Sequence, residues 1–319
     1  MDGFGADIDG PLIAVRAVHF AATAITAGTL VFRTVVTNPA SPAEPAVAQS
    51  FRTQTQRVAW IGLATAMISG VIWLLLQASS MSGLPFDEAM TSRVLSTVLS
   101  QTQFGQVSEI RMAMAVILAA CLAFRRTPLT DWLALALALG LTAAIAWTGH
   151  AGSTLGELGN LHLAADVLHL SAAAGWIGGL VSLVVLLAAA RRHPATAWAQ
   201  LARDATRRFS ILGIASVATL LLTGIVNAWI LVGSFHALTA TGYGRLLMFK
   251  VAAFAAMVAF AAVNRFWLTP ELDSAGGLPG DVLHRLTRNS TIEIVLGLLI
   301  FAIVGMLGTL HPAIHLVPG

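Results

Sequence analysis

Residues 163–190 read LAADVLHLSAAAGWIGGLVSLVVLLAAA, an apolar run long enough to cross a bilayer as one helix. Two ionisable residues, Asp166 and His169, lie within this run. A histidine within a membrane span is costly unless it faces a cavity or a partner. We therefore expect this helix to lie inside a helix bundle, with His169 turned away from lipid and marking a candidate functional site.

A second histidine lies in the same local setting. His19 belongs to the apolar run 11–33, in the sequence AVRAVHFAATAITAG, and Gly28 follows it by nine residues. Gly178 follows His169 at the same interval. Two intramembrane histidines at matching positions predict one site that is built from two related halves.

The composition indicates a polytopic membrane protein. Of the 319 residues, 57% are hydrophobic and only 10% are charged, whereas soluble domains have about 25% charged residues. A water-soluble fold of this size could not bury so much apolar surface. The single cysteine, Cys121, excludes a disulfide framework and a CxxC metal site.

Eight apolar runs predict an all-α fold with eight transmembrane helices. They cover 11–33, 56–78, 109–124, 131–149, 163–190, 209–233, 243–268 and 289–310. The loop between the second and third runs contains a further segment, about 85–102, which we expect to form an amphipathic helix on the periplasmic surface. The lipid bilayer is thus the first predicted partner of the chain.

The distribution of arginine predicts the orientation of the bundle. The loops that follow spans 1, 3, 5 and 7 hold 13 of the 18 lysine and arginine residues. These loops should be cytoplasmic, which places both termini in the periplasm. The same distribution accounts for the pI near 10.0 without a nucleic acid partner. No Walker A, GxSxG or HExxH motif occurs, so we expect neither nucleotide binding nor enzymatic activity.

Imidazole and thioether side chains gather in the predicted outer half of the bundle. Both groups are copper ligands, and thioethers select Cu(I). The candidate metal ligands are His19, His150, His169, His311, Met112 and Met114. His162, near the start of span 5, is interpreted as interfacial, because it lies closer to the membrane surface than His169.

Further landmarks recur in order in the two halves of the chain. In pairs they are Gly70 and Gly224, Arg111 and Lys250, and His150 and His311. This pattern predicts a 4+4 parallel internal repeat, with residues 1–150 as the first four-helix half and 151–319 as the second. Its axis would run along the membrane normal. A chance likeness between apolar helices is the alternative.

Four residues are expected to support the metal site without binding the metal, namely Asp166, Arg16, Trp176 and Asn227. Asp166 lies three residues before His169, where a carboxylate can orient the ring, and helical spacing places Trp176 on the same face. Arg16 has the corresponding place before His19. An intramembrane Arg16–Asp166 pair that joins spans 1 and 5 is one interpretation, and an arginine that snorkels outward is the other.

The predicted inner half has few groups that could bind a metal. Cys121, Asn264 and Glu293 are the candidates there, and Glu293 is expected to pair with Arg288 or Arg265. The sequence does not predict a continuous path of ligands. Either the protein alternates access around a fixed outer site, or it binds metal without moving it across the membrane.

Several stretches carry a resemblance to a known family. They are HLSAAAGWIGGL (169–180), RFSILGIASVATLLLTGIVNAWILVG (208–233), YGRLLMFKVAAFAAMVAFAAVNRF (243–266) and LGTLHP (307–312). The chain resembles the CopD/PcoD copper resistance family of YebZ-like inner-membrane proteins. The resemblance is densest over about 160–312, and FGQVSEIRM (104–112) extends it toward the N-terminus.

The resemblance implies a bacterial inner-membrane protein that handles copper together with a periplasmic CopC-type copper-binding partner. Because no CopC-type β-domain is recognised in the chain, we expect that partner to be separate. His19, His150 and His169 fall on the histidines of spans 1, 4 and 5 of the family. Family members are described as taking copper into the cytoplasm.

Three functions remain open from the sequence. The first is copper transport, with copper accepted from the periplasm at the outer site and passed inward. The second is electron transfer by a haem b group, with His19 and His169 as axial ligands. The third is a membrane copper chaperone that moves nothing across the bilayer.

Overall fold

The structure is a computed structural model that describes residues 9–37, 44–124, 127–193, 196–274 and 280–316. Every regular element within these ranges is a helix, and eight helical segments are long and apolar enough to cross a membrane. The prediction of an all-α bundle with eight spans is confirmed. Arg125 and Arg126, which we assigned to an arginine-rich loop, lie outside the described residues.

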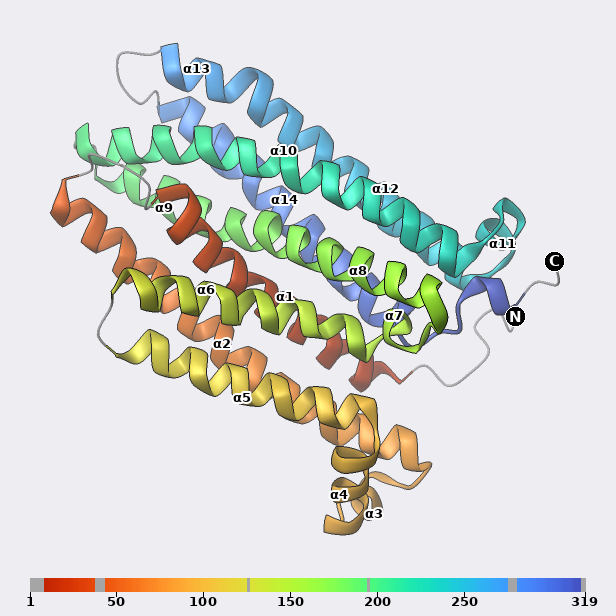
Figure 1. Ribbon diagram of the computed structural model, residues 1–319. Coiled ribbons are helices and arrows are strands. Elements are labelled where there is room, and N and C mark those ends of the chain that lie inside the picture. The colour runs from red at the N-terminus through yellow and green to blue at the C-terminus, as the bar shows by residue number, and fades with distance from the viewer. Residues whose placement is uncertain (1–8, 38–43, 125–126, 194–195, 275–279, 317–319) are drawn as a thin grey trace.

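The first four spans run along the chain with one surface excursion (Figure 1). They are α1 (Gly10–Val31) with η1 (Phe32–Thr37), α2 (Pro45–Ser82), α5 (Gln103–Ala123), and α6 (Pro128–Ala143) with η2 (Ala144–Thr148). Between α2 and α5 lie two short helices, α3 (Phe86–Ala89) and α4 (Ser92–Gln101). These two helices occupy the segment about 85–102, where we expected a surface helix.

The last four spans follow the short helix α7 (His150–Ser153). The fifth span is continuous through α8 (Gly156–Ala173), η3 (Ala174–Gly178) and α9 (Gly179–Arg192). The rest are α10 (Thr196–Val232), α11 (Phe235–Ala240), α12 (Gly242–Val263) with η4 (Asn264–Leu268) and α13 (Thr269–Ser274), α14 (Gly280–Leu307), and η5 (Ala313–His315). Three of the short segments, η1, η3 and η4, are π-helical.

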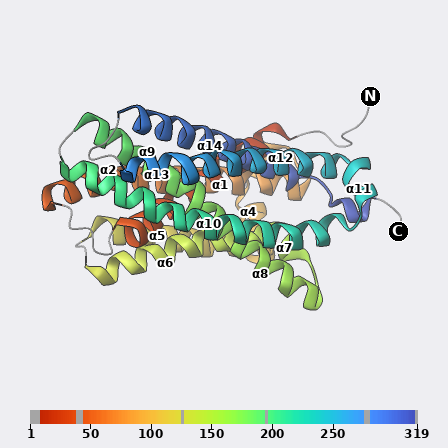
Figure 2. The ribbon, with the colours of Figure 1, turned by 90° about the horizontal axis from the view of Figure 1, so that it is seen from above.

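Spans 1 and 5 form the centre of the bundle. In their most apolar stretches 72% and 67% of the residues are buried, against 11% to 39% for the other six spans. Figure 1 shows α1 running through the middle of the bundle, where it contacts α2, α6, α9 and α14. In the view from above (Figure 2), the long helices run side by side along one direction. The two helices that hold His19 and His169 are thus the ones best shielded from lipid.

The central helices cross at the two glycines that follow those histidines. A Cβ added at Gly28 would strike the carbonyl oxygen of Ala174, and one added at Gly178 would strike that of Ala24. Each glycine therefore lies against the carbonyl four residues before the other glycine. Only residues without a side chain permit such an approach of two helix backbones, which explains the shared interval between histidine and glycine.

Helices α5 and α12, which follow the short helices α4 and α11, begin in the same way. Thr102 caps α5 by accepting a hydrogen bond from the amide of Gly105 at 3.0 Å, and Thr241 caps α12 by accepting one from Gly244 at 3.0 Å. A Cβ at either glycine would strike the backbone of the preceding helix, α4 or α11. The two starts are N-caps of the usual kind, in which a side-chain oxygen satisfies a free amide.

Both ends of the bundle can be recognised in Figure 1. Helices α3, α4, α7 and α11 lie at one end. Gly305, near the end of α14, lies close to Ile13 at the start of α1, so the first and last spans have their terminal ends on this side. The end of α9 and the starts of α2, α10 and α14, which carry several of the arginines, lie at the opposite end. The membrane orientation and the 4+4 repeat both stay predictions.

Candidate metal centre

His19 on α1 is fixed by a hydroxyl group of the neighbouring helix α2. Its Nδ1 lies 3.0 Å from Oγ of Ser69, and Ser69 donates its own proton to the carbonyl of Thr65 at 2.6 Å. The serine oxygen therefore accepts from Nδ1–H, which leaves the lone pair of His19 on Nε2. This is the tautomer that a histidine needs in order to bind a metal through Nε2.

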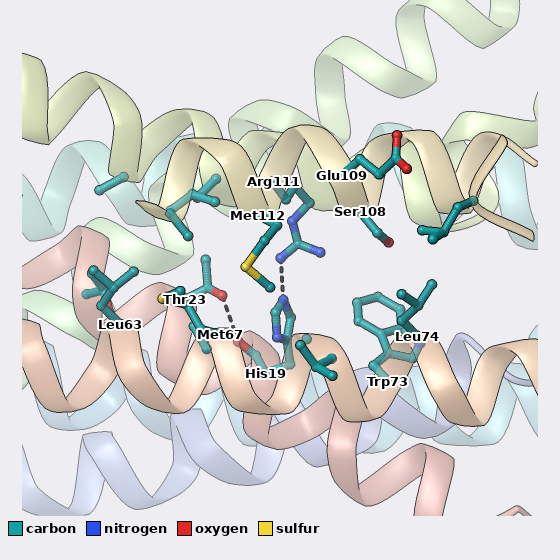
Figure 3. Close-up of a pocket in the computed structure, with 18 residues that line it drawn as sticks. His19, Thr23, Leu63, Met67, Trp73, Leu74, Ser108, Glu109, Arg111 and Met112 are labelled. Carbon is teal, nitrogen blue, oxygen red and sulfur yellow. Dashed lines mark hydrogen bonds between the residues drawn. The ribbon is translucent and has the colours of Figure 1, made fainter. Parts of the chain in front are cut away.

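Arg111 on α5 occupies that lone pair. Its guanidinium donates a hydrogen bond to Nε2 of His19, and both side chains are buried (Figure 3). The guanidinium also lies 5.9 Å from the ring of Trp73, and Arg16 lies 5.3 Å from the same ring. In this arrangement a cation at His19 would meet a like charge and no free nitrogen, so the ring is closed to metal.

A cavity of about 270 Å³ opens beside His19. Met67 from α2 and Met112 from α5 both line it, and Figure 3 shows the Met112 sulfur next to the contact between His19 and Arg111. Met114, our other candidate on α5, instead packs against Gly140 of α6 and does not line the cavity. The structure thus brings one imidazole and two thioethers to the same space.

His169 on α8 has the same type of support from α10. Its Nδ1 lies 2.9 Å from Oγ1 of Thr223, and Thr223 donates to the carbonyl of Thr219 at 2.6 Å. The lone pair of His169 is therefore also on Nε2. Among the described residues no group is hydrogen-bonded to that nitrogen, and the side chain is half-buried.

The glycines that we matched between span 2 and span 6 each lie beside one of these rings. A Cβ on Gly70 would lie 3.2 Å from Cε1 of His19, and one on Gly224 would lie 3.6 Å from Cε1 of His169. The hydroxyl residue that fixes each ring comes directly before the glycine. Each histidine thus packs against a hydroxyl–glycine pair, Ser-Gly or Thr-Gly, on the next helix.

The structure does not pair Arg16 with Asp166. Arg16 is buried over Trp73, as described above, whereas Asp166 accepts a hydrogen bond of 3.2 Å from Asn227. Trp73 and Asn227 each lie three residues after a matched glycine, so the two polar residues occupy matching places with different partners. Asn227 thus contacts Asp166, and its support of a metal site stays a prediction. Lys250, the counterpart of Arg111, lies within electrostatic range of both Asp166 and His169.

Trp176 does not continue the face of His169. It lies in the π-helical turn η3, where it interacts with Glu293 and packs edge-on against Phe254 with ring centroids 6.0 Å apart. A π-turn contains more residues than an α-turn, and it changes the direction of every side chain that follows. Spacing based on an α-helix therefore misplaced this residue.

The other outer histidines lie near the end of the bundle. His150 has its Nε2 3.4 Å from the carbonyl of Leu307. His162 is only 1% exposed and its Nδ1 lies 2.9 Å from Thr154 Oγ1, so it is buried between helices, and its interfacial depth stays a prediction. The ring of His162 is within electrostatic range of His150. His311 is exposed.

The predicted ligands do not form one cluster. Within the described part of the chain no three His, Cys, Asp or Glu side chains lie close enough to hold a metal ion together. His19 contacts α2 and α5, and His169 contacts α10, because the central helices meet along their glycine faces and turn the rings toward different neighbours. The role of each residue as a metal ligand stays a prediction.

Sequence reasoning passed over several residues of this region. Ser69 and Thr223 fix the rings, and Met67 lines the cavity. The signal for the first two was present, since a hydroxyl residue precedes both matched glycines in SGVIW and TGIVN. Met67 had no comparable signal, because its contact with the cavity depends on how the helices are rotated.

Fold and site define a polytopic membrane protein that holds histidines inside its helix bundle. The chain belongs to the copper resistance protein D family, as its motifs indicated. The family description "Copper resistance protein D" matches residues 203–307. The description "Copper resistance protein D-like, N-terminal domain" matches residues 7–160.

Three relatives cover most of the chain. "Copper resistance protein D" of Pseudomonas syringae pv. tomato is 32% identical over 268 residues, which are 82% of this chain and 84% of that protein. "Copper transport protein CutJ" of Bacillus subtilis (strain 168) is 30% identical over 80% of this chain and 46% of its own length. "Inner membrane protein YebZ" of Escherichia coli (strain K12) is 26% identical over 94% and 98%. No solved structure matches the chain.

These findings identify a multi-pass inner-membrane protein of a copper resistance and transport family. The family is not one of known enzymes.

Proposed function

We propose that this protein carries copper across the inner membrane, with His169 and His19 as its intramembrane ligands. The observation that supports this most strongly is the matched pair of rings. In each, a hydroxyl of the next helix holds Nδ1–H and turns the lone pair of Nε2 toward the helix neighbours. A hydrogen-bond partner that holds the second ring nitrogen in this way is typical of histidines that bind metals.

The surroundings of the rings favour copper over harder cations. Met67 and Met112 line the cavity of His19, and thioether sulfur together with imidazole selects Cu(I). Carboxylates are scarce there, as Glu109 is the one acidic residue among those that line this cavity. Metals such as Mg²⁺ and Ca²⁺ require several oxygen ligands.

His169 would bind copper before His19 does. Its Nε2 has no bonded partner among the described residues, and the carboxyl of Asp166 lies one helical turn away on the same face. His19 differs because the guanidinium of Arg111 blocks its nitrogen. Transfer to His19 would require Arg111 to move away, so Arg111 would act as the gate of the second position.

The outer pair His150 and His162 would be the first to contact copper and would pass it to His169 without retaining it stoichiometrically. His162 precedes His169 by seven residues on α8 and therefore lies about 10 Å from it along the helix axis. Copper would reach this pair from a separate periplasmic CopC-type protein, with both termini of the chain in the periplasm. The inward direction of transport and the CopC-type partner are both parts of this proposal.

The assignment of ligands is tested by copper binding in detergent. We expect His19→Ala combined with His169→Ala to abolish stoichiometric binding of Cu(I), because both intramembrane imidazoles are lost. His284→Ala, an exposed histidine at the opposite end of the bundle, is the matched control and should bind as the wild type does. Stoichiometric copper in the double variant would overturn the assignment.

A membrane chaperone is the second candidate, since the described structure has no path of ligands beyond the outer half. Haem b is less well supported. A haem needs two rings that face one another, whereas His19 and His169 contact different helices, and the cavity of about 270 Å³ beside His19 is at the lower limit for a drug-sized ligand. A Soret band in the purified protein would favour haem.

A further inference from the structure

A buried carboxyl lies nearer the arginine-rich end of the bundle than His19 and His169 do. Glu293 on α14 is 1% exposed. Its Oε1 accepts a hydrogen bond of 2.8 Å from the amide of Asn264, whose own oxygen accepts one of 3.0 Å from Asn289. Trp176 is a further hydrogen-bond donor to the carboxyl. The side chain is thus held in one orientation by neutral groups from three helical segments.

Two of these donors are presented by π-helical turns. Trp176 belongs to η3 (Ala174–Gly178), and Asn264 begins η4 (Asn264–Leu268). π-Helical turns are rare, and they are frequently found at functional sites. Two such turns from different spans meet at one carboxyl.

Within the described residues no lysine or arginine nitrogen lies within 4.0 Å of the Glu293 carboxyl, the limit for an ion pair, so the expected pairing with Arg288 or Arg265 was wrong. Arg265 is the one basic residue that lines the same cavity, and the other polar groups there are neutral. An ionised carboxylate in such surroundings is strongly disfavoured, and it takes up a proton instead.

The carboxyl borders a cavity of about 320 Å³ between α9, α10, α12 and α14. Ser290, one turn before Glu293, is fully buried and lines this cavity, and among the described residues its Oγ has no hydrogen-bond partner. Most of the wall is apolar, but Thr206 and Ser210 of α10 add hydroxyl groups to it. A cavity of this size has room for water at its polar groups, and water at Ser290 would supply the missing partner.

We propose that Glu293 is a proton-exchange site of the transport cycle. Its carboxyl releases one proton to water in this cavity, which carries it to the arginine-rich end, and the carboxylate takes a proton back when the cycle is complete. Loss of one proton offsets the charge of one Cu(I) ion that enters the bundle. The exchange itself is independent of copper, whereas its coupling to copper rests on the proposed function.

Infrared spectroscopy of the purified full chain tests the exchange. The carbonyl stretching band of a protonated carboxyl is distinct from the bands of carboxylates. We expect the wild type to show this band at pH 7 and Glu293→Gln to lack it, since the amide keeps an acceptor for Asn264 but holds no acidic proton. Asp166→Asn identifies any contribution of the other buried carboxyl, and Glu271→Gln, at an exposed residue, is the control.

Identical bands in the wild type and Glu293→Gln at pH 7 would overturn the proposal. In a second measurement, Cu(I) is added to the protein. Loss of the Glu293 band on addition supports the coupling, and an unchanged band in a protein that binds copper refutes it. A protein that binds no copper contradicts the proposed function alone, because the spectra without metal still decide on the proton site.

Discussion

At the scale of the residue, a hydroxyl group on the next helix decides which nitrogen each histidine offers. Ser69 and Thr223 do this for His19 and His169 at 3.0 Å and 2.9 Å. The difference between the two rings lies on the other nitrogen, where Arg111 is bonded to His19 only. The two rings therefore have the same tautomer, but Arg111 blocks Nε2 of His19, whereas Nε2 of His169 has no hydrogen-bond partner among the described residues.

Thr223→Val tests this support directly. The methyl group fills the place of the hydroxyl but cannot accept from Nδ1–H, so the ring of His169 loses its fixed tautomer. We expect affinity for Cu(I) to fall about 10–100-fold, which is the usual effect of losing such a partner. The measurement is a competition titration with a chromophoric Cu(I) chelator.

Thr219→Val is the matched control, one turn earlier on α10. Its hydroxyl bonds only to the carbonyl of Ala215, so affinity should stay at the wild-type value. Equal affinities in both valine variants would show that Thr223 does not support a ligand.

The sequence predicted which rings belong to the site better than it predicted their partners. His19 and His169 could be found because a histidine in an apolar helix is rare, and Gly70 and Gly224 because they recur in order. The pairing of Arg16 with Asp166 could not be judged, since it depends on the rotation of two helices about their axes. That rotation follows from packing at Gly28 and Gly178.

At the scale of the element, hydropathy was sufficient to find all eight spans but not their ends. Helix α2 begins at Pro45 and α10 at Thr196, well before the apolar runs at 56 and 209, because turns rich in polar and charged residues extend both helices beyond the apolar runs. The π-turns η3 and η4 could not be predicted. A local change of hydrogen-bond register leaves no mark on hydrophobic periodicity.

The crossing of α1 with η3 is the contact at which we expect small substitutions to destabilise the bundle most. Gly28→Ala and Gly178→Ala each push a methyl group into a backbone carbonyl of the other helix. Overpacking of this kind costs about 1–3 kcal/mol. We expect both variants to unfold at a lower temperature in detergent.

Gly213→Ala is the comparison for the crossing variants. A Cβ on Gly213 of α10 meets no atom within 4 Å, and alanine is the better helix former. The midpoint temperature of its thermal unfolding in detergent should match or exceed that of the wild type. If Gly28→Ala is as stable as Gly213→Ala, the close approach of the central helices is refuted.

At the scale of the whole molecule, the two histidine spans are the inner helices and the other six surround them. The predicted 4+4 repeat is favoured by matched contacts: a capped glycine at the start of α5 and α12, a hydroxyl–glycine pair beside each histidine, and a reciprocal glycine crossing. The matched places of Arg16 and Asp166 hold opposite charges. The halves would thus be alike in backbone and different in electrostatics.

The orientation of the whole bundle is tested by cysteine labelling in intact cells. In a Cys121→Ser background, Ser96→Cys lies on α4 and His284→Cys near the start of α14, both exposed and at opposite ends. We expect a membrane-impermeant maleimide to label Ser96→Cys in intact spheroplasts and His284→Cys only after lysis. The reverse pattern would place the arginine-rich loops in the periplasm.

We propose that copper crosses the membrane by way of the intramembrane histidines. The most direct test of this proposal is accumulation of Cu(I) in proteoliposomes that contain the purified protein. The wild type and His284→Ala should accumulate copper above the level of empty liposomes, and His19→Ala combined with His169→Ala should not. A wild type that binds copper but accumulates none would contradict transport and leave a membrane chaperone.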